Sequence, residues 1–225
     1  RAAHDAAKRG FGTIKIKVGG AVPADDVARV RAARQEVGSH VRIRVDANQD
    51  WSEAEAVAAL RAMESFGIEY CEQPVPAGAI ESMARVRAAV SVPIAADESV
   101  ADATSARRVL EARAADVIVV KPMALGGLHA ARAVAAQAQE FGAGVVVTSL
   151  LESEVGRAGA LHFAASLGRG RYAHGVAAGV SLSGTNDTGC LDGGVLPVTR
   201  ANITEHWFLK LGLRLEDLAG IEEAA

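Results

Sequence analysis

The sequence has few cysteines, few aromatic residues and no long apolar run. Its two cysteines, Cys71 and Cys190, are too few for a disulfide framework and lack metal-ligand spacing, which predicts a reducing, cytoplasmic environment. No apolar run reaches the ~18 residues that a membrane-spanning helix needs. The opening residues RAAHDAAKR are typical of a helix with one polar face rather than of a signal peptide. We therefore expect no membrane partner.

The sequence also lacks an excess of charge of one sign. Its 24 Lys and Arg residues against 27 Asp and Glu residues give a net charge of -3, without a basic block. This balance predicts no nucleic-acid partner. Half of the residues are hydrophobic and 23% are charged, which excludes a disordered chain and indicates a folded one. The expected partner is a small molecule.

Short β-branched runs alternate with alanine-rich segments along the chain. The runs cover residues 13–18, 41–46, 68–72, 92–97, 116–121 and 144–149, with a weaker seventh near 172–176. The segment 52–66 between two of these runs starts with a capping box of Ser52 and Glu55, and Gly67 suits the position after its end. This alternation predicts βαβ units and a parallel sheet covered by helices.

A polar residue ends each run, and these residues recur every 24 to 29 positions: Lys17, Asp46, Glu72, Asp97, Lys121, Ser149 and His174. A doubly wound sheet fits the alternation but usually concentrates its chemistry at one switch point. A (β/α) TIM-type barrel gathers the carboxyl ends of all its strands at one mouth, and it is the fold we predict. Eight strands complete such a barrel, so we expect the first strand upstream of Arg1, in a longer protein.

Two lysines share one face of the first run. Because side chains alternate along a strand, Lys15 and Lys17 point to one side, into the barrel, whereas Ile14, Ile16 and Val18 point to the other. Repulsion between two neighbouring ammonium groups is expected to lower the pKa of each, toward the range of a general base. The alternative is an exposed edge strand with two ordinary lysines.

Three carboxylates end three successive runs. Asp46, Glu72 and Asp97 would repel one another at a barrel mouth unless a cation neutralises them. A set of oxygen ligands suits Mg²⁺, with Mn²⁺ as a substitute. Taken singly, each carboxylate also fits a helix N-cap or a loop salt bridge.

Lys121 ends the run that faces the first one across the predicted barrel. Lys17 and Lys121 would then lie on two sides of a substrate carboxylate, an arrangement for proton transfer at its α-carbon. A competing interpretation makes Lys121 the Schiff-base lysine of a metal-independent aldolase. That chemistry needs no carboxylate cluster, which favours the first interpretation.

The motifs KIK (15–17), DAN (46–48), EQP (72–74), DES (97–99), KP (121–122) and SLLES (149–153), in this order, resemble the barrel domain of the enolase superfamily, in its muconate lactonizing enzyme subgroup. The resemblance implies that the three carboxylates bind Mg²⁺, that Lys17 and Lys121 are the acid/base pair, and that Lys15 tunes Lys17. Its remaining implications concern the surroundings: Asn48 and Glu98 would support the ligands, and Ser149 and Glu152 would lie beside a small-molecule carboxylate substrate. Ser149 stands where the branches with a histidine base carry that histidine.

The resemblance implies a reaction that removes the proton α to a carboxylate and passes through an enediolate. We expect the dehydration that forms o-succinylbenzoate in menaquinone biosynthesis, with Lys17 taking the proton and Lys121 stabilising the intermediate. The alternatives are a racemase or epimerase of N-acyl amino acids or dipeptides, a muconate-type cycloisomerase, and a truncated barrel fragment without catalysis. Association into a homo-oligomer stays open.

The resemblance also divides the chain. Residues 1–185 are expected to form the barrel domain, and residues 186–225 a return segment and a helix that pack on an N-terminal α+β capping domain. That domain is expected upstream of Arg1. Among the six histidines, only His174, at the end of the last run, is a candidate for substrate contact.

Overall fold

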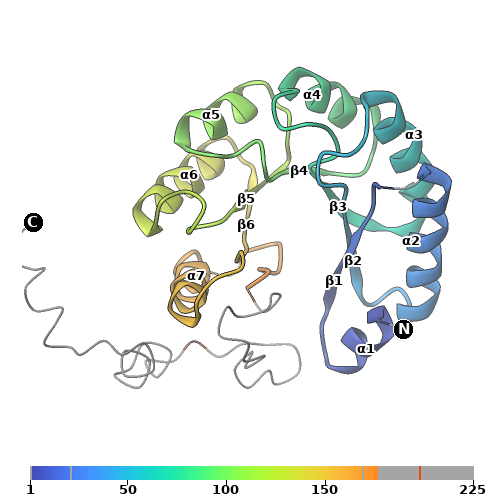
Figure 1. Ribbon diagram of the computed structural model, residues 1–225, viewed down its shortest axis with the longest axis horizontal. Helices are drawn as coiled ribbons and strands as arrows, with labels where there is room; N and C mark the ends of the chain where they lie inside the picture. Colours follow the sequence, from blue (N-terminus) through green and yellow to red (C-terminus); the bar gives the residue numbers. More distant parts are fainter. Residues whose placement is uncertain (1, 21, 169, 177–197, 199–225) are drawn as a thin grey trace, which may run out of the picture.

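The protein forms a curled, six-stranded parallel sheet (Figure 1). The computed structural model describes residues 2–20, 22–168, 170–176 and 198. The strands follow one another in chain order: β1 (Thr13–Lys17), β2 (Arg42–Asp46), β3 (Ile68–Glu72), β4 (Ile94–Ala96), β5 (Val117–Val120) and β6 (Gly144–Val147). The sheet is a half-barrel, so the predicted TIM-type architecture is confirmed in partial form.

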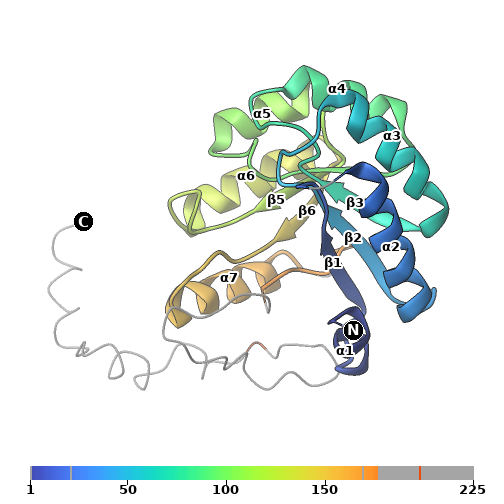
Figure 2. The ribbon, with the colours of Figure 1, turned by 45° about the vertical axis from the view of Figure 1, so that its right-hand side comes forward.

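Helices cover the outer face of the sheet (Figures 1 and 2). The helices of the described residues are α1 (Ala2–Lys8), α2 (Pro23–Val37), α3 (Glu53–Met63), the 3₁₀ turn η1 (Glu64–Phe66), α4 (Ile80–Ala89), α5 (Ala103–Glu111), α6 (Leu128–Glu140) and α7 (Glu154–Ser166). Helices α2 to α6 lie along the outside of the curl, and α7 lies on its open side. Within the described ranges, no helix combines the length and the apolar character that crossing a membrane requires.

The local signals in the sequence set the helix boundaries. Ser52 accepts a hydrogen bond from the backbone N–H of Glu55, whose side chain accepts one from the backbone of Ser52 in return. Gly67 has a φ of 64°, in the left-handed region that suits glycine after a helix. The predicted capping box and the predicted stop are both confirmed.

The seventh predicted strand is much shorter than expected. Within the described residues, the segment 172–176 makes a single parallel bridge, between Thr148 and Gly175, and the N–H of Gly175 donates to the carbonyl of Val147 at 2.8 Å. The predicted return segment 186–225 lies outside the described residues apart from Val198. Beyond the six strands, the barrel therefore continues by one bridge in the part of the chain that the structure describes.

Two apolar clusters pack against the sheet. The larger one fills the space between the sheet and the helices, and it includes Ile43 and Val45 of β2. The smaller one lies inside the curl, where the rings of Tyr70 and Tyr172 meet edge to face with their centroids 5.8 Å apart. This inner cluster packs against the inner face of the sheet.

Three arginines tie neighbouring βα units together at the end of the sheet where the strands begin. Arg34 of α2 donates to the carbonyls of Phe66 and Gly67, just before β3. Arg61 of α3 donates to the carbonyl of Ala89, at the end of α4. Arg87 of α4 pairs with Asp116, just before β5 (2.7 Å). Each helix is thus bound to the turn of the next unit.

Candidate active site

The strand register brings the predicted site residues to one edge of the sheet. Lys17 lies opposite Asp46, and Asp46 lies opposite Glu72, because β1, β2 and β3 are paired in parallel. Asp97 directly follows β4, and Lys121 directly follows β5. These five side chains line a cavity of about 680 Å³. The structure therefore gathers the residues that the sequence scatters over 105 positions.

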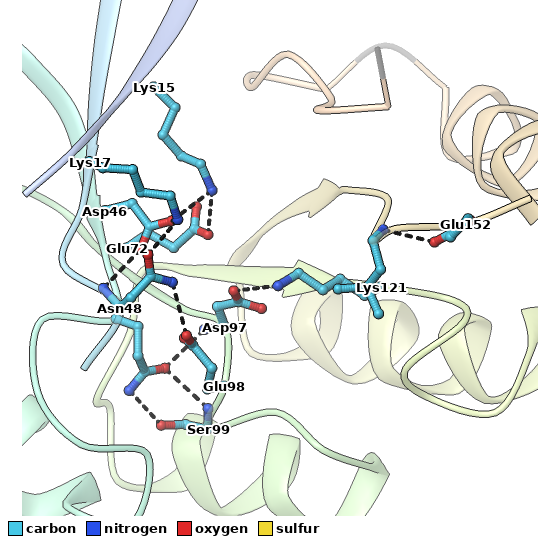
Figure 3. Close-up of polar contacts among 12 residues, drawn as sticks. Lys15, Lys17, Asp46, Asn48, Glu72, Asp97, Glu98, Ser99, Lys121 and Glu152 are labelled. Carbon is cyan, nitrogen blue, oxygen red and sulfur yellow. Dashed lines mark hydrogen bonds and ion pairs between the residues drawn. The ribbon is translucent and has the colours of Figure 1, made fainter. Parts of the chain in front are cut away.

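The lysines of β1 bind the carboxylates of β2 and β3 (Figure 3). Lys15 Nζ lies 2.9 Å from Asp46 Oδ2 and 2.7 Å from Glu72 Oε1. Lys17 Nζ donates to Asp46 Oδ2 at 2.7 Å and also to Asn48 Oδ1. The side chain of Lys15 is 35% exposed and that of Lys17 is 64% exposed, so Lys17 is the one more open to solvent.

The expected lowering of the lysine pKa is wrong for Lys15. Burial alone would lower its pKa, but the charges of Glu72 and Asp46 outweigh burial and raise it. The same contacts act on Asp46: burial would raise the pKa of its carboxyl group, and Lys15 and Lys17 together lower it. The two lysines each face a carboxylate rather than mainly each other, which explains the opposite sign.

Lys121 approaches the cluster from the other side. Its Nζ lies 2.5 Å from Asp97 Oδ2, and only 21% of its side chain is exposed. In Figure 3, Lys17 and Lys121 reach toward the carboxylates from opposite sides, with Asp97 between them. The structure places Lys17 and Lys121 on two sides of the carboxylates. That they flank a substrate stays a prediction.

The residues expected around the ligands and the substrate fall into two groups. Asn48 and Ser149 line the cavity, and Asn48 Nδ2 donates to Glu98 Oε1 at 3.0 Å. Glu152 is buried and is not among the lining residues; its Oε1 accepts from the N–H of Leu150 at 2.9 Å, within its own loop. Contact of Ser149 or Glu152 with a substrate stays a prediction.

The donor set at the mouth fits a hard cation. Burial is the main cause that raises the pKa of Glu72 to about 7, and its Oε2 atom is buried without a hydrogen-bond partner. Within the described ranges, no three His, Cys, Asp or Glu side chains are placed so that they could hold a metal ion as they stand. A lysine is paired with each of the three carboxylates. The carboxylate oxygens of Asp46, Glu72 and Asp97 are of the kind that Mg²⁺ prefers, and a bound ion would replace the lysines as their partner.

Sequence reasoning missed two residues at this edge. Arg44 points into the cavity from β2, where it stacks on Tyr70 (4.6 Å to the ring centroid) and pairs with Glu69 (2.6 Å). The alternation that places Lys15 beside Lys17 also places Arg44 beside Asp46, and it could have revealed this arginine. Gln73 is completely buried. The sequence indicated it only as the second residue of the EQP motif and assigned it no role.

A sequence model of the family described as "Enolase C-terminal domain-like" matches residues 1–189. The chain belongs to this family. The resemblance to the enolase superfamily, in its muconate lactonizing enzyme subgroup, is thereby confirmed, since synthases, epimerases and cycloisomerases of that kind all match.

Two curated relatives represent different reactions within the family. The L-Ala-D/L-Glu epimerase of Bacillus subtilis is 45% identical over 161 residues, which cover 71% of this chain and 44% of that protein. The o-succinylbenzoate synthase of Thermobifida fusca is 42% identical over 211 residues, which cover 91% of this chain and 64% of that protein. The chain thus spans about half to two thirds of the length of these relatives.

A solved structure of the family contains a metal. The dipeptide epimerase of Enterococcus faecalis, complexed with Mg and the dipeptide L-Leu-L-Tyr, has a TM-score of 0.74 and 36% identity, over 77% of this chain and 49% of that chain. The similarity of the two backbones shows that this chain shares the fold of the family as well as its sequence pattern. The enolase C-terminal domain-like relatives of this chain are enzymes that act on small molecules.

Proposed function

We propose that the protein that carries this chain removes a proton from the carbon next to a carboxylate, in a reaction that depends on Mg²⁺. The observation that carries the proposal is the placement of Lys17 and Lys121 on opposite sides of three carboxylates (Figure 3). Carboxylates concentrated in this way favour a cation, and lysines on two sides favour proton transfer to or from a carbon held between them.

Asp46, Glu72 and Asp97 would hold the metal ion. When bound, Mg²⁺ supplies positive charge that stabilises the negative charge developing on the oxygens of a substrate carboxylate. The buried Oε2 of Glu72, which has no hydrogen-bond partner, supports this assignment. Asn48 lies in the same part of the site, where its side-chain amide joins Lys17 to Glu98.

Lys17 is the proposed base. As a neutral amine, its Nζ takes the α-proton, and the electrons of the C–H bond move toward the carboxylate. In a dehydration, the β C–O bond then breaks, and the ammonium of Lys17 returns the proton to the departing hydroxide, so that water leaves and Lys17 is neutral again. Lys121, as an ammonium, stabilises the negative charge from the opposite side.

For the specific reaction, we propose dehydration to o-succinylbenzoate. The support is the length of the match: the T. fusca synthase aligns with 91% of the chain, whereas the B. subtilis epimerase aligns with 71%. The second candidate is epimerisation of a dipeptide or an N-acyl amino acid, favoured by the 45% identity to that epimerase. In an epimerisation, Lys121 would return a proton to the face opposite Lys17, with no loss of water.

The two reactions are distinguished by incubation in D₂O. Dehydration produces a new double bond, which ultraviolet absorbance detects. Epimerisation places deuterium at the α-carbon without a new double bond, which NMR detects. Lys17→Ala should abolish either signal, and Lys8→Ala, which removes an exposed lysine of α1, should leave it unchanged. Full turnover of Lys17→Ala would overturn the assignment of the base.

A further inference from the structure

Gln73 joins the ends of two strands that carry proposed metal ligands. It directly follows Glu72, and its side chain is completely buried. Its Oε1 accepts from the backbone N–H groups of Asp97 and Ser99, both at 3.1 Å. Its Nε2 donates to Ser99 Oγ and to the carbonyl of Val75, both at 2.9 Å. Every donor and acceptor of this amide is thus directed at a specific partner.

The backbone of Gln73 is held as tightly as its side chain. Its N–H donates to the carbonyl of Ala95 in β4, and its carbonyl accepts from Gln49, just after β2; both bonds are 2.8 Å. Its φ is 38°, in the left-handed region, which costs a non-glycine residue about 1 kcal/mol or more. Such a conformation persists where the surrounding contacts enforce it, and here those contacts come from three successive strand ends.

We propose that Gln73 is a positioning residue that fixes Asp97 relative to Glu72, so that both carboxylates can act on one cation. The inference rests on the proposed function. Its physical basis is that the Oε1 atom of one residue binds the main chain of Asp97, while the main chain of the same residue continues from Glu72. A shift of either strand end would therefore have to break a buried hydrogen bond.

Ser99 provides a matched control. Ser99→Ala removes the bond to Nε2 but leaves both bonds to Oε1, including the one from Asp97. Gln73→Met keeps a side chain of similar length and removes all four bonds. Gln73→Glu keeps the oxygen that accepts from Asp97, replaces the Nε2 donor by an oxygen and adds an ionisable group. The three variants separate the bond to Asp97 from the general stability of the loop.

The experiment measures Mg²⁺ affinity by isothermal titration and the exchange rate of the Asp97 amide hydrogen by NMR, on the protein that carries this chain. We expect Gln73→Met to weaken Mg²⁺ binding about 10- to 100-fold and to speed exchange at Asp97 at least about tenfold. We expect Ser99→Ala to bind Mg²⁺ within about threefold of the parent. Gln73→Glu should retain slow exchange at Asp97 and bind Mg²⁺ more tightly than Gln73→Met.

Two results would overturn the inference: Mg²⁺ affinity of Gln73→Met within about threefold of the parent, or unchanged exchange at Asp97 in that variant. If Gln73→Met does not fold, fast exchange at Asp97 in Gln73→Glu overturns it instead. A parent protein that binds no Mg²⁺ would refute the proposed function, whereas exchange at Asp97, which needs no metal, would still decide whether Gln73 holds this strand end.

Discussion

Lys15 Nζ lies 2.7 Å from Glu72 Oε1, although the two residues belong to β1 and β3, which are not neighbours in the sheet. The lysine reaches across β2 and also contacts Asp46, at 2.9 Å. A single ammonium group therefore contacts two buried carboxylates that are the proposed ligands of a metal ion. A metal ion bound as proposed would use the same oxygens as Lys15.

Lys15→Met should destabilise the metal-free protein far more than Lys17→Met. Removing the charge of Lys15 leaves Asp46 and Glu72 close together and less compensated, which should lower the free energy of unfolding by about 2 to 3 kcal/mol, below the ~3–5 kcal/mol of a fully buried pair because Lys15 is 35% exposed. Lys17 is 64% exposed, so its loss should cost less than about 1 kcal/mol. Urea unfolding with EDTA measures both; equal losses would contradict the prediction.

Asp97→Asn should weaken Mg²⁺ binding at least about tenfold and abolish turnover, because it removes one of three anionic ligands. Its fold should be retained, since the amide oxygen that replaces the carboxylate can still accept a hydrogen bond from Lys121. Isothermal titration measures the affinity, and circular dichroism checks the fold. Glu53→Gln, which alters a carboxylate on the exposed side of α3, is the control and should bind Mg²⁺ like the parent. Unchanged affinity in the Asp97 variant would refute the ligand set.

Glu72 should make the metal-free protein less stable as the pH rises. Burial raises the pKa of Glu72 to about 7 from 4.5, so between these values the native state holds a proton that the unfolded state has released. The free energy of unfolding therefore falls as the pH rises from 4.5 to 7, by roughly 2 to 4 kcal/mol from this group. Glu72→Gln should remove that slope in urea unfolding with EDTA. A slope that survives the substitution would have another origin.

His174 should make the protein less stable as the pH falls, which is the opposite of the effect of Glu72. Burial, with a smaller effect of Arg44, lowers the pKa of His174 below 6.5, and its Nδ1 accepts a hydrogen bond from the N–H of Val147 at 3.0 Å. Protonation breaks this bond and favours the unfolded state. The contribution of neutral His174 to the free energy of unfolding is therefore fully present above pH 6.5 and is lost as the pH falls below it. His174→Gln should weaken the acid dependence, measured between about pH 5 and 8. An unchanged profile would contradict the prediction.

The strand ends were predictable because they follow from local patterns. Alternation along β1 separates Lys15 and Lys17 from Ile14, and the spacing of the polar residues places Asp46 and Lys121 on the same edge of a barrel. These inferences need only periodicity and the geometry of parallel strands. The confirmed capping box is local for the same reason.

The partners of each charge were not predictable, because they depend on distances across the sheet. The raised pKa of Lys15 follows from its reach to Glu72, two strands away, which periodicity does not reveal. The four hydrogen bonds of Gln73 arise only when the loops after β3 and β4 meet. Within the described residues, the seventh predicted run forms a single bridge at Gly175, and this run, YAHGV (172–176), contains only one β-branched residue.

Arg34, Arg61 and Arg87 act at the end of the sheet opposite the lysines and carboxylates, and they bind main-chain carbonyls or the structural carboxylate of Asp116. Contacts that hold adjacent units in register are therefore also present at the end of the sheet without chemistry. These three contacts involve no residue of the loops at the mouth, so they do not depend on the sequence of those loops. In barrels of this type the chemistry lies in the loops at the carboxyl ends of the strands, and the relatives of this chain include a synthase in one organism and an epimerase in another.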